Sequence, residues 1–268
     1  MAAARWVALE ARRASRNTPV MRPLYSTLFW LFMCASSLVL YPLAALLCAL
    51  TAPFDPRRRA LHQFSCFWAS LYTWLNPAWP VHVEGRERIR PDEAYIMVAN
   101  HLSLLDILVL FRLFTHFKWV SKTENFRVPF IGWNMRLNRY IELRRGDRAS
   151  VVQMMKACRA ALAGGSSIMM FPEGTRSPTG QLRAFKTGAF DIAKQAQQPI
   201  LPIALQGTHA ALPKRGFVLR GRHPIRLTVL EEIPYASFED VAADELAERA
   251  RVRIAAQLEE KDEPPPVV

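Results

Sequence analysis

The chain has 268 residues, enough for one domain with a large core or for two small ones. Hydrophobic residues make up 51% and charged residues 22%, which excludes a globally disordered or collagen-like chain. The formal net charge is +12, so an anionic partner is expected. The four cysteines form no C-x-x-C pair, and we interpret them as buried small hydrophobes in a reducing compartment.

The N-terminal third has the pattern of a membrane-bound segment. Residues 23–54 contain no charged residue, and residues 28–50 are almost continuously apolar. A helix of that apolar length rises about 35 Å, more than the roughly 30 Å of a bilayer's hydrocarbon core. A signal peptide fits less well, because the charged lead and the apolar run are too long. We therefore predict a basic arm over residues 1–22 and a membrane-associated helical segment over residues 23–80.

Arginines lie on both sides of this segment, so its orientation stays open. Eight of them fall within residues 1–59, and cytoplasmic flanks of membrane segments are enriched in such residues. The segment either turns near residues 36–37 or Pro42 and stays in one leaflet, or crosses once and leaves one basic flank outside.

A second apolar stretch follows at residues 64–75. Its aromatic residues and leucines repeat at helical spacing, with Ser65, Ser70 and Thr73 off the stripe. The stripe fits a helix packed on a protein core or a helix at a membrane interface. Nearby tryptophans favour the interface.

Residues 81–260 alternate strand and helix patterns. This alternation predicts an α/β domain, with a mixed, largely parallel sheet flanked by helices. The expected strands are residues 81–84, 95–99, 119–120, 140–143, 167–171, 200–205 and 225–230. The expected helices are residues 105–114, 149–162, 188–197 and 241–258. Residues 261–268, with three consecutive prolines, are predicted to form a disordered tail.

The first candidate for chemistry is a histidine just after the strand predicted at residues 95–99. His101 and Asp106 have H-x-x-x-x-D spacing, and an imidazole beside a carboxylate makes a general base. On one ideal helix the two would lie about 140° apart, so we expect His101 in the preceding loop and Asp106 in the first turn. Asp106 also ends an S-x-x-D capping box that starts at Ser103, so helix capping is its alternative role. The two roles are compatible.

A second candidate is the run Phe-Pro-Glu-Gly-Thr-Arg-Ser at residues 171–177, also just after a predicted strand. Gly174 permits a tight turn, and Arg176 offers a planar fork for a phosphate. The alternative is a surface turn with an ion pair between Glu173 and Arg176. Other cations in the neighbouring sequence are Lys186, Arg144 and Arg145.

Together these blocks resemble the 1-acyl-glycerol-3-phosphate acyltransferase family, the lysophospholipid acyltransferases. The four blocks, in the family's order, are His101 with Asp106, the run from Lys122 to Arg145, residues 171–177, and residues 201–204 with Pro202. The second block departs from the family pattern, because Arg139 stands where a glycine is usual. This leaves open whether Arg144 or Arg145 matches the family's arginine.

The resemblance implies an enzyme that moves a fatty acyl group from acyl-CoA or acyl carrier protein to the sn-2 hydroxyl of 1-acyl-glycerol-3-phosphate, giving phosphatidate for phospholipid biosynthesis. It implies that His101 deprotonates the acceptor hydroxyl and that Asp106 orients His101, with no metal and no resident cofactor. The implied substrate-binding residues are Lys122, Arg144, Arg145, Glu173, Gly174, Thr175, Arg176, Lys186 and Pro202. The expected partners are the lipid bilayer, the lysophospholipid and the thioester donor, without nucleic acid.

This chemistry agrees with the residues present. Attack of a substrate hydroxyl on a thioester needs a base and oxyanion stabilisation but no enzyme nucleophile, and the sequence has no G-x-S-x-G elbow. The alternatives are another acceptor (lysophosphatidylglycerol or a lyso-ornithine lipid), a hydrolase or thioesterase that uses the same pair on water, and a non-enzymatic membrane or nucleic-acid binder.

The basic composition also bears on location. Arginines outnumber lysines 28 to 7, which suggests a GC-rich bacterial genome, so we expect the bacterial inner membrane, with the catalytic domain on the cytoplasmic side. A basic strip of Lys214, Arg215, Arg220 and Arg222 either contacts lipid or donor, or forms a solvated hairpin.

Overall fold

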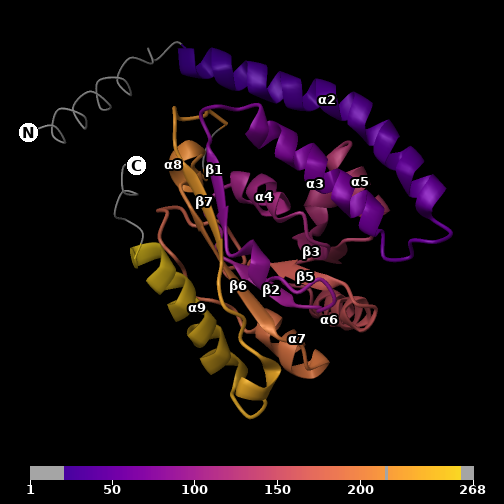
Figure 1. Ribbon diagram of the computed structural model, residues 1–268, viewed down its shortest axis with the longest axis vertical. Coiled ribbons are helices and arrows are strands. Elements are labelled where there is room, and N and C mark those ends of the chain that lie inside the picture. Colours follow the sequence, from indigo (N-terminus) through magenta and orange to yellow (C-terminus); the bar gives the residue numbers. More distant parts are fainter. Residues whose placement is uncertain (1–20, 215–216, 261–268) are drawn as a thin grey trace, which may run out of the picture.

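A seven-stranded sheet lies between two layers of helices (Figure 1) in the computed structural model, which describes residues 21–214 and 217–260. The strand order is β1-β7-β6-β2-β5-β3-β4, and every neighbouring pair is parallel except β6 with β7. The predicted mixed, largely parallel sheet is therefore confirmed. The strands are β1 (Val81–Glu84), β2 (Ile96–Ala99), β3 (Phe117–Lys122), β4 (Ile141–Leu143), β5 (Ser167–Met170), β6 (Ile200–Gln206) and β7 (Ile225–Val229).

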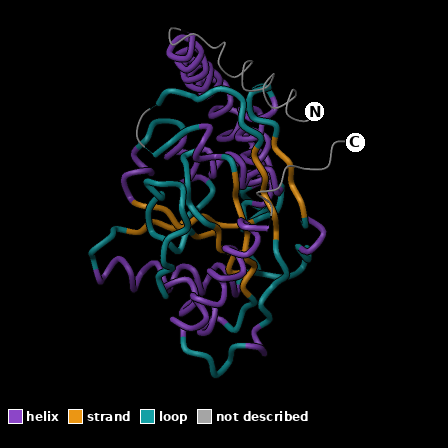
Figure 2. Tube along the Cα trace, turned by 90° about the vertical axis from the view of Figure 1, so that its left-hand side faces the viewer, coloured by secondary structure: helices purple, strands orange, loops and turns teal. Residues whose placement is uncertain are grey.

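The central strand β2 separates two apolar cores. Its side chains alternate, so Met97 and Ala99 join one core while Ile96 and Val98 join the other. All four are fully buried, which explains the continuous apolar run in the sequence. One face is covered by α6 (Arg148–Ala163), α7 (Gly188–Ala196) and α9 (Ala243–Glu260), and the other by α3 (Arg59–Trp74) and α4 (Leu105–Leu110). Figure 2 shows that the strands twist across the molecule, as parallel sheets do.

The long apolar segment forms one helix, α2 (Met21–Thr51), which lies outermost along α3 and α5 (Ile131–Leu137) (Figure 1). Among the described residues it is the one helix long and apolar enough to cross a membrane. The helix continues through Pro42, so the turn that one alternative placed near residues 36–37 or Pro42 is wrong. The basic arm lies, apart from residues 21–22, outside the described residues, as do the predicted tail and Arg215.

Helix α3 buries small polar side chains together with Trp68 and Tyr72 on its protein side, and exposes other aromatic side chains on its outer side. Ser65, Ser70 and Thr73 are at most 4% exposed, whereas Phe67 and Trp74 are 42% and 46% exposed. The buried face finds polar partners, because Asn134 of α5 and Asn138 donate to the Ser65 hydroxyl at 2.9 and 3.1 Å. The exposed aromatic side chains suit a helix whose outer face meets an apolar medium.

A buried lysine ties the α2–α3 hairpin to the sheet. Lys118 of β3 is 5% exposed, and its ammonium donates to the carbonyls of Arg57, between the two helices, and of Asn138, at 2.6 and 2.7 Å. Burial lowers the pKa of Lys118 to about 8. The Arg58 guanidinium adds a bond to the Cys48 carbonyl of α2. The hairpin is thus fastened to the domain at its closed end.

The main departures from the predicted elements are short. Strand β3 begins at Phe117 rather than at residue 119, and α4 ends early and continues as a 3₁₀ turn, Phe111–Leu113. Helices α5 and α8 (Thr208–Ala211) were not expected, because seven and four residues are too few to show a helical period.

Candidate active site

The two candidate motifs meet at the carboxyl edge of the sheet. His101 follows β2 and residues 171–177 follow β5, and these strands are parallel neighbours. Loops after adjacent parallel strands leave the sheet at the same edge, where α/β proteins commonly bind ligands. The fold therefore explains why motifs about 70 positions apart in the sequence form one site.

His101 and Asp106 form the expected pair. His101 lies in the loop before α4, and its Nδ1 donates to Asp106 Oδ2 in the first turn at 2.8 Å. With Nδ1 protonated, the lone pair of Nε2 is available as a base, and no described residue hydrogen-bonds Nε2. The His101 side chain is 14% exposed and Asp106 is fully buried. The base thus reaches the surface while its orienting carboxylate does not.

Asp106 also organises the loop itself. Its Oδ2 accepts the backbone N–H groups of Leu102 and Ser103, both at 2.7 Å, and the Ser103 hydroxyl accepts from Leu105 at 3.2 Å. This is the reciprocal pattern of a capping box. Orienting the histidine and capping the helix are therefore both roles of Asp106. Three donors, counting His101 Nδ1, thus converge on this one buried oxygen.

The loop of residues 171–177 holds His101 from three sides. Glu173 Oε1 accepts from the His101 backbone N–H at 2.7 Å, and the Ser177 N–H donates to the His101 carbonyl at 2.8 Å. The Phe171 ring stacks on the imidazole, with centroids 3.8 Å apart and an interplanar angle of 8°. The loop therefore fixes both the backbone and the ring plane of His101.

Glu173 lies beneath the histidine loop and is 3% exposed. Burial, reinforced by the nearby Asp106 carboxylate, raises the pKa of Glu173 to about 7. No ion pair joins Glu173 to Arg176 among the described residues, so the surface-turn alternative is wrong. In this position Glu173 supports His101, and its contact with an acceptor phosphate stays a prediction.

Cations border the open side of this loop. Gly174 has φ +72°, and a Cβ there would lie 3.1 Å from Lys186 Cε, so the glycine lets the lysine cross the turn. The Lys214 ammonium donates to the Arg176 carbonyl at 2.7 Å. This bond places part of the basic strip beside the loop, where Thr175 is half-buried. Within the described residues neither Arg176 nor Lys186 forms an ion pair.

The remaining predicted residues lie farther along the sheet or inside it. Lys122 ends β3, and Arg144 and Arg145 follow β4, so these exposed cations share the carboxyl edge but lie two or three strands from β2. Arg144 approaches Asp147 at 3.7 Å. Pro202 is buried in β6 beside Val98 of β2. The substrate contacts of all four stay predictions.

Two buried polar side chains support the histidine loop through contacts that the sequence did not predict. The Asn100 side chain donates to the Leu205 carbonyl at 2.9 Å and accepts the Leu205 N–H at 2.8 Å, joining the ends of β2 and β6. The Ser103 hydroxyl donates to the Leu212 carbonyl at 2.6 Å. The only available signal was the position of Asn100 between an apolar strand and the histidine.

The N-terminal half of α2 reaches the same end of the molecule. Trp30 Nε1 donates to the Phe217 carbonyl at 2.8 Å, and the Leu219 N–H donates to the Ser26 hydroxyl at 2.9 Å. The segment that contains Phe217 and Leu219 follows Lys214, which contacts the catalytic loop. Helix α2 is therefore hydrogen-bonded to residues 217–219, which lie close in the sequence to Lys214.

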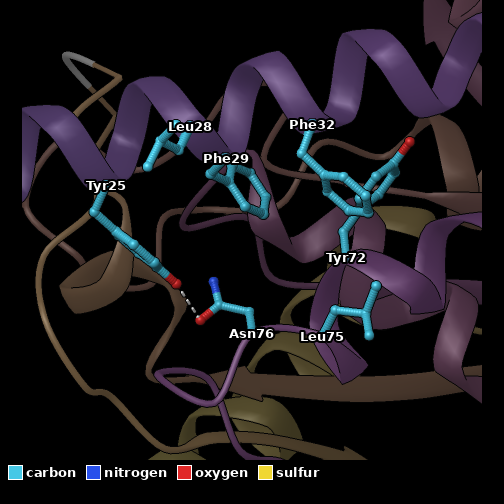
Figure 3. A pocket seen from close by; sticks show the side chains of 7 residues that line it. All are labelled: Tyr25, Leu28, Phe29, Phe32, Tyr72, Leu75 and Asn76. Carbon is cyan, nitrogen blue, oxygen red and sulfur yellow. Dashed lines mark hydrogen bonds between the residues drawn. The ribbon is translucent and has the colours of Figure 1, made fainter.

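An apolar groove of about 220 Å³ lies between α2 and α3 (Figure 3). Its polar end is closed by Tyr25, which donates to Asn76 at 2.6 Å. The other lining residues are Leu28, Phe29, Phe32, Tyr72 and Leu75.

The sheet, the His101–Asp106 pair and the loop that clamps it define an α/β enzyme of the acyltransferase class, and the Acyltransferase family model matches residues 80–206. The chain is 37% identical to a 1-acyl-sn-glycerol-3-phosphate acyltransferase of Chlamydomonas reinhardtii over 85% of this chain and 67% of that protein. It is 32% identical to that of Pseudomonas aeruginosa over 67% of this chain and 69% of that protein. A chloroplastic relative from Arabidopsis thaliana is 36% identical, and the chain spans 56% of its length.

The chain belongs to the 1-acyl-sn-glycerol-3-phosphate acyltransferase family. The crystal structure of the 1-acyl-sn-glycerophosphate acyltransferase from Thermotoga maritima superimposes with a TM-score of 0.72, covering 90% of this chain and 97% of that one. At 24% identity, that likeness concerns the fold.

Proposed function

We propose that the chain transfers a fatty acyl group from an acyl thioester, acyl-CoA or acyl carrier protein, to the sn-2 hydroxyl of 1-acyl-glycerol-3-phosphate. The product is phosphatidate. The observation that carries this proposal is the His101–Asp106 pair with an open Nε2, bordered by cations that have no ion-pair partner among the described residues. The relatives named above as 1-acyl-sn-glycerol-3-phosphate acyltransferases support the same reaction.

The reaction follows from the geometry in two steps. The acceptor hydroxyl attacks the thioester carbonyl while His101 Nε2 takes its proton, and Asp106 stabilises the resulting imidazolium. The C–S bond of the tetrahedral adduct then breaks, the ester remains, and the imidazolium returns the proton to the departing thiolate. The stacked Phe171 ring and the clamped backbone keep the imidazole in place throughout.

Arg176 and Lys186 are the groups we assign to the acceptor phosphate. Arg176 belongs to the loop that fixes His101, and Lys186 crosses Gly174 of that loop. A phosphate held by the two would place the glycerol hydroxyl near Nε2. A guanidinium fork and an ammonium are strong phosphate ligands. Lys122, Arg144 and Arg145 are candidates for the donor's charged groups, because they lie on the same edge but farther from β2.

We further propose that the protein is membrane-associated, at the inner membrane of a bacterium with the active site on the cytoplasmic side. The exposed leucines of α2 and the aromatic face of α3 support immersion in lipid. The acceptor is a membrane lipid and the donor is water-soluble, so a site beside the anchoring helix gives access to both. Protease protection in oriented membrane vesicles tests the orientation.

An acceptor panel tests the proposed reaction. Purified protein in vesicles would receive labelled acyl-CoA with lysophosphatidate, glycerol 3-phosphate, lysophosphatidylglycerol or a lyso-ornithine lipid. We expect product from lysophosphatidate, and Arg176→Ala is expected to raise KM for this acceptor far more than for the donor. Product from another acceptor alone, or an equal change in both KM values, would contradict the assignment of the phosphate site.

A further inference from the structure

A second cavity, which is polar and has a volume of about 340 Å³, lies at the amino edge of the sheet, opposite the active site. Its walls come from the start of α3, from the segment after β1, and from the residues that precede β3 and β5. Since β2, β3 and β5 are parallel, their amino ends lie on the edge opposite His101. The four residues of β2 separate the two edges by about 13 Å. Residues important to its chemistry are Arg59, Arg86, Arg90, Glu93, Phe114 and His116.

The charge of this cavity is positive. Arg90 approaches Glu93 at 3.7 Å and binds Glu232 at 2.7 Å, so the acidic lining residue has a cationic partner. Arg59 and Arg86 are exposed, and no ion pair among the described residues involves either one. Two cations from separate chain segments therefore face the same cavity. The Asp55 carboxylate just before α3 accepts the Ala60 N–H at 2.9 Å, so it is bonded to the backbone rather than to either guanidinium.

Further donors line the cavity. The Arg57 guanidinium lies against Gly165, within about 3 Å of where a Cβ would stand, so another cation reaches the wall. His116 uses Nε2 on the Ser166 hydroxyl at 3.0 Å, and its buried Nδ1 has no partner. Burial, with the positive charges of Lys118, Arg59 and Arg57, lowers the pKa of His116 to about 3. The Arg57 guanidinium and the His116 ring therefore add polar groups to the wall that Arg59 and Arg86 border.

One wall of the cavity is aromatic and continues onto the outer face of α3. The Arg86 guanidinium lies over the Phe114 ring, 5.9 Å from its centroid. Phe114 stacks on Trp74, with centroids 5.9 Å apart and an interplanar angle of 17°. Trp74 belongs to the exposed aromatic face described above. The cationic cavity and the apolar surface are thus contiguous, as a lipid with a charged head and apolar chains would require.

We propose that this amino-edge cavity binds the phosphate of an anionic phospholipid, held between Arg59 and Arg86, with the lipid's chains along the aromatic face of α3. The site is distinct from the catalytic edge and does not depend on the proposed acyl transfer. A guanidinium fork on each side matches the oxygens of a phosphodiester. Bound there, a lipid would hold the start of α3 against the segment after β1.

Calorimetric titration of the full chain in neutral detergent tests this site. The probes are dihexanoyl-phosphatidylglycerol, dihexanoyl-phosphatidylcholine and inorganic phosphate. The test variant is R59A/R86A, and the matched control is R148A/R159A, which removes the same charge from exposed positions on α6. R59K/R86K retains charge and loses the fork. Melting temperatures establish that each variant is folded.

We expect R59A/R86A to weaken binding of the anionic lipid about tenfold or more, and R148A/R159A to change it less than twofold. R59K/R86K should fall between them, and transfer measured on micellar substrate should be unchanged in R59A/R86A. Equal losses in the alanine variant and its control would show net charge alone and overturn the proposal, as would no loss in R59A/R86A. Inorganic phosphate binding as tightly as the lipid would overturn the assignment to a lipid.

Discussion

The α2–α3 hairpin and the α/β domain differ in how much apolar surface they leave exposed. In the domain, β2 is apolar on both faces, and its polar neighbours gather beyond its carboxyl end. In the hairpin, α2 exposes leucines along its length and α3 exposes Phe67 and Trp74, while Ser65 of α3 binds Asn134 of α5. The difference indicates two surroundings: the domain is folded for water, and the hairpin is folded for a surface that is not water.

The exposed leucines on the outer face of α2 allow the free energy of membrane binding to be estimated. Leu31, Leu38 and Leu46 are 59%, 60% and 56% exposed on one helix. Fully removing a leucine side chain from water is worth about 1.5–3 kcal/mol. Burying the exposed part of these three leucines and of their neighbours in a bilayer would therefore provide several kcal/mol of binding free energy.

The largest expected effect is on the acyl-transfer activity of the α/β domain, without a change in membrane binding. His101→Ala removes the base, so kcat for acyl transfer is expected to fall about 10³–10⁴-fold. Vesicle binding should be unchanged, because His101 lies in the domain rather than in the hairpin. The matched control is His82→Ala, an exposed histidine on β1. Preserved transfer in His101→Ala would refute the base assignment.

The converse change is aimed at the hairpin. Leu31→Asp with Leu38→Asp places two carboxylates on the exposed face of α2, each costing about 2.5–3.5 kcal/mol in hydrocarbon. We expect vesicle binding to fall more than a hundredfold, while transfer to acceptor in detergent micelles stays within threefold. Val152→Asp, at a 66% exposed position on α6, is the control. Undiminished vesicle binding would mean that α2 is not the lipid-facing element.

Glu173 supports the site from a buried position, and its effect on stability can be measured as a function of pH. Burial raises its pKa from 4.5 to about 7, so the folded chain favours the protonated carboxyl. The stability that the protonated Glu173 contributes is fully present below pH 4.5 and is lost as the pH rises through 7. Glu173→Gln is neutral throughout and keeps an acceptor for the His101 N–H. Its free energy of unfolding, relative to wild type, should increase over this window by at most about 3 kcal/mol.

Chemical unfolding of both proteins between pH 4 and 9 checks this expectation. A difference that does not vary with pH would show that Glu173 is not the buried titrating group. Glu173→Ala, which leaves the His101 N–H without its acceptor, is expected to lower kcat about tenfold while leaving KM for the acceptor nearly unchanged. A change confined to KM would instead favour direct contact with the phosphate.

The smallest expected effect compares the buried and the exposed face of α3. Ser65→Leu adds apolar volume to a face that needs a hydroxyl for Asn134 and Asn138, so the free energy of unfolding should fall by about 1–3 kcal/mol. Trp74→Ser, on the outer face, should change stability in detergent far less and should weaken vesicle binding. Denaturant titration measures the first effect and vesicle sedimentation the second. The reverse order would mean that α3 is an ordinary amphipathic helix.

The sequence predicted the sheet well because its signals are local. The strand β2 is buried on both faces, so its apolar run was visible, and His101 with Asp106 could be placed before and within α4 by helical geometry alone. The burial of Glu173 was not predictable, because it depends on β2 and β5 being neighbours. The partner of Ser65 on α3 was missed for a similar reason: it is Asn134 of α5, about 70 positions away.

The most direct test of the account is the product ratio from lysophosphatidate and labelled acyl-CoA with the purified full chain in vesicles. Phosphatidate and free fatty acid would be separated and counted in the presence and absence of the acceptor. If His101 activates the lipid hydroxyl, phosphatidate accumulates with the acceptor and little free acid forms without it. Free acid released at the same rate with and without the acceptor would contradict the account, because His101 would then be activating water.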